Sequence, residues 1–185
     1  MSVSIAKQQE TLTVEAFWEL SHREGFRGEL VAGEVRELVP PGLEHGRASG
    51  RLVYLLTAFA EAKNLGMVFT EAGFVLSRDP ATVLAPDVSF IAADRLPAVI
   101  PEKFSDILPD LAVEVVSPGD AYSEVQDKAE RFRAAGVKEV WVVDPRRRSV
   151  MILRAPREWI ALSGEDRLET PLLPGFAASV ADLFR

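Results

Sequence analysis

The sequence predicts an α/β fold in which a mixed central sheet is flanked by helices. Two valine-rich segments, 111–116 and 139–143, are apolar along nearly their whole length, which is typical of central strands covered on both faces. Between them, residues 121–135 carry apolar side chains at helical spacing. A strand–helix–strand unit of this kind predicts two parallel strands joined by a crossover helix.

The first third of the chain predicts a helix, a hairpin and a longer helix. Thr13 is a suitable N-cap for a helix that ends near Glu24. Residues 29–39 read as two short strands around a tight turn that contains a glycine. After a Pro-Pro-Gly break, leucines at helical spacing predict a helix over 43–63.

Short strands and turns account for most of the remaining chain. We expect hairpins on both sides of the strand–helix–strand unit, with strands over 67–70, 73–76, 86–92, 149–153 and 158–162 and a short helix near 180–184. Residues 1–10 are expected to form a flexible tail, and residues 11–185 a single domain, as the length favours.

Composition excludes several classes of protein. No apolar stretch approaches the roughly 20 residues of a membrane span, and the N-terminus has no apolar segment of the signal-peptide type, so we expect a cytoplasmic protein without a membrane partner. The chain has no cysteine and two histidines, which argues against a zinc site of the usual nitrogen and sulfur type. Any metal is therefore expected to be a hard cation held by carboxylates.

The net charge of −7 argues against nonspecific coating of nucleic acid. The charge is uneven, however, because residues 128–148 carry seven basic and three acidic side chains. This segment is typical of a solvated helix and turn, and it is also the segment expected to contact DNA if the protein binds DNA, through Arg131, Arg133, Arg146, Arg147 and Arg148.

Three polar residues stand in apolar surroundings: Asp87, Glu114 and Lys128. Glu114 interrupts a valine-rich strand, where a carboxylate is costly unless a cation meets it. A divalent metal would satisfy both Asp87 and Glu114, and this points to hydrolysis of phosphodiesters, with Lys128 near the reacting phosphate. The sequence contains no glycine-rich phosphate-binding loop, which argues against a nucleotide cofactor.

Each of these residues also has a purely structural interpretation. Glu114 can form a buried ion pair with Lys128 or an arginine, and Asp87 can cap a neighbouring amide. Lys128 can pair with Glu124, four residues earlier on the same helix.

Three further residues are accessory candidates for the same site. Glu29 would add a third carboxylate, although an exposed charge at a strand end is an equally good account. His45, at the start of the long helix, would touch a phosphate, but we expect it to lie in solvent. Gln126 faces either the site or water.

The order of these motifs resembles the Uma-two family of bacterial proteins, which belongs to the PD-(D/E)XK nuclease superfamily. The resemblance covers roughly residues 12–184 and is most specific over 110–145. Its motifs are Pro86-Asp87, Glu114-Val115-Val116-Ser117-Pro118, Asp127-Lys128, the run from Ala135 to Pro145, and an N-terminal segment like Glu29–Glu34.

The resemblance implies a restriction-endonuclease-like core with Asp87 and Glu114 as metal ligands. The superfamily usually has a lysine two residues after the second acid, and here that residue is Val116. In this family a lysine on the following helix takes that place, and Lys128 matches it. Glu29 matches an acid that some members contribute from the N-terminal region.

The sequence thus leads to one expectation and two rivals. The expectation is an endonuclease that cleaves DNA with Mg²⁺ or Mn²⁺ and acts as a homodimer, by analogy with nucleases of this fold. One rival is a noncatalytic binding or assembly module that kept the fold, which the negative charge favours. The other is a metal-dependent hydrolase of a small phosphorylated molecule, which a narrow pocket would favour.

Overall fold

The computed structural model describes residues 11–154 and 158–185. Its main layer is a six-stranded mixed sheet, here called the large sheet, with strand order β10-β9-β8-β7-β6-β3. In chain order its strands are β3 (Gly66–Thr70), β6 (Val88–Ala92), β7 (Leu111–Val115), β8 (Glu139–Asp144), β9 (Ser149–Leu153) and β10 (Trp159–Ser163). The predicted α/β class with a mixed sheet is confirmed.

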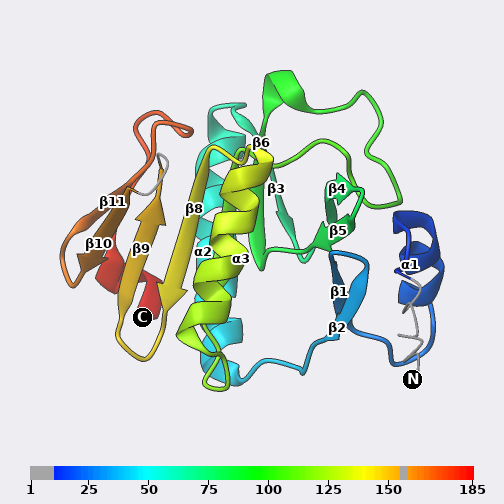
Figure 1. Ribbon diagram of the computed structural model, residues 1–185. Coiled ribbons are helices and arrows are strands. Elements are labelled where there is room, and N and C mark those ends of the chain that lie inside the picture. The colour runs from blue at the N-terminus through cyan, green and yellow to red at the C-terminus, as the bar shows by residue number, and fades with distance from the viewer. Residues whose placement is uncertain (1–10, 155–157) are drawn as a thin grey trace, which may run out of the picture.

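Helices cover both faces of the large sheet (Figure 1). Helix α2 (Leu43–Ala62) packs on one face, and α3 (Tyr122–Ala135) packs on the other. Strands β7 and β8 are parallel, as their connection through α3 predicts, and the other pairs in this sheet are antiparallel.

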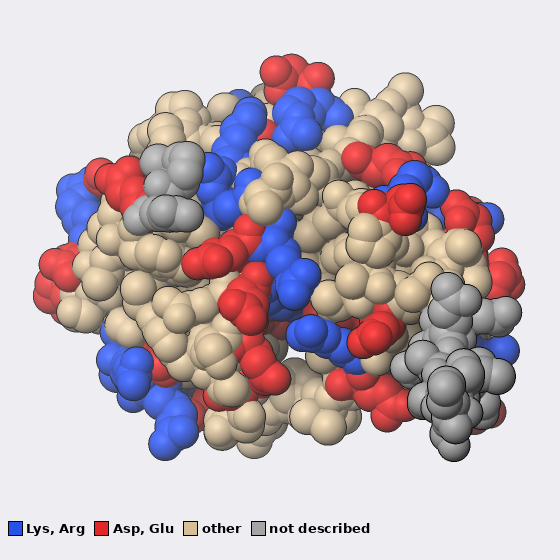
Figure 2. Space-filling view, in the orientation of Figure 1, with Lys and Arg blue, Asp and Glu red and all other residues tan. Residues whose placement is uncertain are grey.

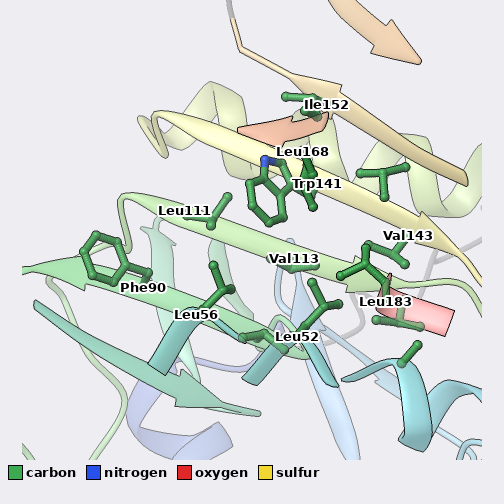
Figure 3. Close-up of a cluster of buried hydrophobic side chains, with 14 of the residues drawn as sticks. Leu52, Leu56, Phe90, Leu111, Val113, Trp141, Val143, Ile152, Leu168 and Leu183 are labelled. Atoms are coloured by element: carbon green, nitrogen blue, oxygen red, sulfur yellow. The ribbon is translucent and has the colours of Figure 1, made fainter. Parts of the chain in front are cut away.

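The core of the large sheet shows why these residues form central strands. On the α2 face, Leu52 and Leu56 contact a layer of strand residues that includes Leu111, Val113 and Trp141 (Figure 3). All five side chains are fully buried. The opposite residues of β7, Ala112 and Glu114, face α3, which is the alternation that a strand requires.

A second sheet is the main feature that the sequence did not predict. This small sheet has the order β2-β1-β5-β4 and carries α1 (Val14–Ser21), whose N-cap is Thr13 as predicted. Its strands are β1 (Gly28–Val31), β2 (Glu34–Glu37), β4 (Phe74–Arg78) and β5 (Ala81–Leu84). Strand β5 was missed because its four residues directly follow Asp79-Pro80, a pair typical of a turn.

The chain passes between the two sheets three times, through residues 38–42, 71–73 and 85–87. The turn between β1 and β2 uses left-handed backbone at Ala32 (φ 51°) and Gly33 (φ 81°), which matches the twist of a tight hairpin. The small sheet therefore lies beside the large one, with β1 and β5 as its two central strands (Figure 1).

The C-terminal region completes the cover of the α2 face. A hairpin of β11 (Arg167–Glu169) and β12 (Ala177–Ser179) precedes a short 3₁₀-helix, Val180–Phe184, whose Leu183 joins the core (Figure 3). The hairpin was not predicted. A second 3₁₀-helix, Ala93–Arg95, follows β6. The expected flexible tail, residues 1–10, lies outside the described residues, and no helix among those described is long and apolar enough to cross a membrane.

Asp110 fixes the start of β7, the strand that carries Glu114. Its side chain is 1% exposed and contacts Arg95 (2.8 Å), Lys138 (2.7 Å) and the Ala92 amide (2.8 Å). Burial alone raises the pKa of Asp110, but the hydrogen bonds from Lys138, Ala92 and Arg95 outweigh it, so the pKa is lowered. Asp110 therefore joins the end of β6 to the start of β8 across β7.

We expect Asp110→Asn to lower the free energy of unfolding by about 1–3 kcal/mol, because Arg95 and Lys138 lose a charged acceptor. The cost is limited because both cations also reach solvent. Since the pKa of Asp110 is lowered from 3.8, this contribution is complete above that pH and is lost as the pH falls below it. Urea unfolding between pH 3 and 7 measures the difference. The exposed neighbour Asp94 gives the control variant, Asp94→Asn, and an equal effect in both variants would contradict the assignment.

Candidate active site

Three carboxylates from different strands converge where the two sheets meet. Strand β1 carries Glu29, Asp87 immediately precedes β6, and Glu114 lies on β7. Strands β6 and β7 are antiparallel, and Val88 lies opposite Val113. The next pair in this register places Asp87 beside Glu114. The small sheet supplies Glu29 from the other side, so residues 85 positions apart in the chain reach one site.

Lys128 joins the two sheets. Its Nζ lies 2.9 Å from Glu29 Oε1, 2.9 Å from Glu114 Oε2 and 3.2 Å from the carbonyl oxygen of Ala85. The amide of Ala85 in turn donates to Glu29 Oε1 at 2.9 Å. An ammonium has three N–H donors, so Lys128 uses all of them on the protein.

Asp87 is held by a backbone amide of β7 and by a histidine of α2. The Val115 amide donates to its Oδ2 at 2.6 Å, and His45 Nε2 from α2 lies 3.2 Å from its Oδ1. The hydrogen bond with Asp87 raises the pKa of His45, against the effect of burial. His45 thus holds a proton next to Asp87 more readily than a free histidine does.

Glu114 is the least satisfied group of the site. It is 7% exposed, and its Oε1 is buried without a hydrogen-bond partner in the described part of the chain. Burial raises its pKa well above the ordinary value; the Lys128 ammonium opposes the rise, and the charges of Asp87 and Glu29 add to it. Burial alone lowers the pKa of Lys128, but Glu114 and Glu29 outweigh it and the net pKa is raised.

The cluster carries more negative charge than its cations balance. Glu29, Asp87 and Glu114 face one ammonium, and a protonated His45 adds at most one further positive charge. Excess negative charge at a buried site is costly, and a bound cation removes that cost. Among the residues described, no group of three or more histidine, cysteine, aspartate or glutamate side chains is arranged to hold a metal ion.

The donor set nevertheless fits a hard divalent cation. Mg²⁺ is commonly bound through only one or two carboxylates and keeps several waters, so Asp87 and Glu114 are sufficient ligands of the protein. The unpartnered Oε1 of Glu114 is the atom with a free lone pair for this purpose. Glu29 is already occupied by Lys128 and Ala85.

A cleft of about 920 Å³ opens over these residues. One wall is the β1–β2 hairpin with Arg27 and Arg36, and the other is α3 with Arg131. The connection 38–42 lies at its rim, where Val39 is 86% exposed. Figure 2 shows acidic and basic side chains side by side over the middle of this face, where α3 lies in Figure 1, so the surroundings of the site are not uniformly basic.

The structure brings together most of the residues that the sequence singled out. Asp87, Glu114, Lys128, Glu29 and His45 all line the cleft. The expectation that His45 lies in solvent is wrong, because it is 8% exposed and contacts Asp87. Glu29 is 6% exposed, not a strand-end charge in water, because the small sheet covers it.

Other predicted residues lie apart from the cluster. Gln126 is not among the residues that line the cleft. Of the five arginines expected to contact DNA, Arg131 lines the cleft, whereas Arg133 donates to the carbonyl of Val137. The other three, Arg146, Arg147 and Arg148, lie in the turn between β8 and β9.

The sequence interpretation missed three contributors. The backbone of Ala85 connects Lys128 to Glu29, and no side-chain pattern signals a backbone contact. Arg27 and Arg36 line the cleft from the hairpin, and their proximity to the predicted strand carrying Glu29 was the available signal.

Comparisons with known proteins place this chain in a family. The model of the Uma2 (Uma-two) family, described as "Putative restriction endonuclease", matches residues 14–181. The chain belongs to the Uma2 family. The match includes Glu29, Asp87, Glu114 and Lys128, and it confirms the resemblance inferred from the motifs.

The fold of this Uma2 chain is similar to a solved structure. That structure, from Anabaena variabilis ATCC 29413, is described as "a putative nuclease belonging to DUF820". The TM-score is 0.80 at 20% sequence identity, and the alignment covers 94% of this chain and 97% of the other. A search among curated proteins gives no match.

In this Uma2 chain we expect Lys128→Met to lower the free energy of unfolding at pH 7 by about 3–5 kcal/mol, because Glu29 and Glu114 lose their common cation in a buried site. The loss should shrink as the pH falls toward 5, since protonation of the raised-pKa Glu114 removes an unpaired charge. Urea unfolding at both pH values tests this. Arg131→Met, an exposed change on the same helix, is the matched control, and an equal loss at pH 7 would contradict the central role of Lys128.

Proposed function

We propose that the protein is a divalent-metal-dependent endonuclease that hydrolyses DNA phosphodiester bonds with Mg²⁺ or Mn²⁺. The observation that carries the proposal is the buried, unpartnered Oε1 of Glu114 beside Asp87 in an open cleft. Membership of the family described as "Putative restriction endonuclease" and the restriction-endonuclease-like fold support it.

Asp87 and Glu114 are the residues that would hold the metal. A divalent ion bound there supplies a Lewis acid for phosphate oxygens and lowers the pKa of bound water. The protein fixes both carboxylates before any ligand arrives, because Val115 and His45 hold Asp87 while Lys128 holds Glu114. Preorganised charge of this kind needs little rearrangement during a reaction.

Lys128 keeps a positive charge at the site at neutral pH, since its pKa is raised. To contact a phosphate oxygen or an attacking water, its amine must release one of its three acceptors. The contact with the Ala85 carbonyl, at 3.2 Å, is the longest and is neutral, so it is the first to exchange. Glu29 then acts as a positioning residue that keeps the ammonium beside Glu114.

The cleft suits a polymer rather than a small molecule. Its volume of about 920 Å³ is near the upper limit for pockets that enclose a small ligand, and it has arginines on both walls. Arg27, Arg36 and Arg131 are placed to contact backbone phosphates, which fix the position of a strand without reading its sequence. A homodimer that presents two such sites to two strands, with Arg133 and Arg146–Arg148 as further contacts, belongs to the same proposal.

We expect Glu114→Gln to abolish both Mn²⁺ binding and DNA cleavage and to leave the fold intact. The substitution removes a carboxylate whose raised pKa shows that its charge is costly in the folded state, so thermal unfolding should occur at the same or a higher temperature. Calorimetric titration with Mn²⁺ and cleavage of supercoiled and single-stranded DNA with Mg²⁺ or Mn²⁺ are the measurements.

The matched control is Glu124→Gln, the same chemical change at an exposed position of α3 that also lines the cleft. It should retain Mn²⁺ binding and cleavage. Unfolding of Glu114→Gln, or an unchanged Mn²⁺ affinity, would overturn the assignment of the ligands. Equal DNA cleavage by wild type and Glu114→Gln would show that the nuclease activity belongs to another site or to a contaminant.

A further inference from the structure

A second cavity, of about 310 Å³, lies beside β3 at the edge of the large sheet. Aromatic rings from four segments line it: Trp18 of α1, Phe69 of β3, Phe74 of β4 and Phe104. The rings of Trp18 and Phe104 meet edge to face at 5.0 Å, and Phe104 stacks on Phe17 at 5.5 Å. Packing therefore fixes these rings in place without a ligand.

The charges of this aromatic cavity indicate what can enter it. Its lining contains two carboxylates, Glu71 and Glu102, and one ammonium, Lys103. This balance disfavours a phosphate but suits a neutral planar ring whose amino groups donate to carboxylates. Stacking of a nucleobase on an aromatic side chain contributes about 1–3 kcal/mol and occurs with every base.

The aromatic cavity adjoins the candidate active site through Glu71, which lines both. Thr70 pairs with Val88, so Glu71 and Asp87 lie next to each other in register at one end of β3 and β6. The residue shared by the two cavities is therefore the register neighbour of Asp87.

The backbone at this junction is strained. Glu71 has φ 51°, in the left-handed region, where a residue with a side chain costs about 1 kcal/mol or more. Glu71 begins the turn 71–73, which connects β3 to Phe74, and Phe74 is a buried residue of the cavity lining. The surrounding packing maintains this turn between the two cavities.

We propose that the aromatic cavity binds a nucleobase of the strand whose phosphate lies at Asp87 and Glu114. The proposal rests on the nuclease function proposed above and adds a substrate class to it: strands with an unpaired base next to the cleaved bond. A base inside a duplex must leave its stack to enter the cavity, at a cost of a few kcal/mol that an unpaired base does not incur.

The test measures base binding without metal or cleavage. The protein has three tryptophans, so labelling with 5-fluorotryptophan gives three fluorine-19 resonances, of which Trp18→Phe identifies one. Titration with deoxyadenosine or deoxycytidine in EDTA should shift the Trp18 resonance and leave that of the buried Trp141 unchanged. Phe69→Ala should weaken binding about tenfold, as loss of one stacking partner predicts. Met67→Ala, on the same strand but outside the cavity, should not.

A second experiment uses wild-type protein with Mg²⁺ or Mn²⁺ and single strands that carry one abasic site. Slower cleavage next to the abasic position than in the intact strand supports the proposal. Normal cleavage at the abasic position, with no response of Trp18 to deoxynucleosides, overturns it and leaves the nuclease function standing.

Binding of deoxynucleosides without cleavage of any DNA supports the cavity and overturns the nuclease function. A Trp18 resonance that changes with protein concentration alone, together with a dimer in sedimentation, would show that a second copy of the chain covers the cavity and would overturn the proposal.

Discussion

The contact of one ammonium with two carboxylates holds this structure together at its centre. Lys128 belongs to α3, Glu114 to the large sheet and Glu29 to the small sheet, so the three charges fasten three layers to each other. Apolar packing determines where each sheet forms, but these buried charges determine how the sheets meet, because each carboxylate would be costly without the shared cation.

The same contact leaves the site with an uncompensated charge. Lys128 compensates two carboxylates but not three, and Asp87 relies on an amide and a histidine instead. Glu114 keeps one buried oxygen without a partner. The fold thus tolerates a local excess of negative charge, which lowers its stability and which a bound cation would offset.

The sequence predicted the large sheet well because its strands are long, apolar and separated by clear turns. The segments 111–116 and 139–143 needed no tertiary information, and Glu114 was conspicuous because it interrupts one of them. Lys128 was identified as a candidate, but its partner was not settled, because helical spacing alone also fits Glu124. The structure pairs Lys128 with Glu114 and Glu29 rather than with Glu124.

What the sequence did not predict depends on contacts between distant segments. His45 resembled a solvent-exposed helix start, because nothing near it in the chain indicates that Asp87 will lie against it. The four residues of β5 pair with β1 and β4 to complete the small sheet, and a strand so short has little pattern of its own. The small sheet buries Glu29, so the burial of Glu29 could not be predicted without predicting that sheet.

The three passages of the chain between the sheets have a mechanical consequence. Each of them, at 38–42, 71–73 and 85–87, contributes residues to the cleft, so the connections between the sheets and the candidate site share the same pieces of backbone. A rotation that widens the cleft for a bulky polymer must bend all three together, and it must also stretch the contacts of Lys128 with Glu29 and Ala85. Widening of the cleft and loosening of the lysine amine are thereby coupled through the same contacts.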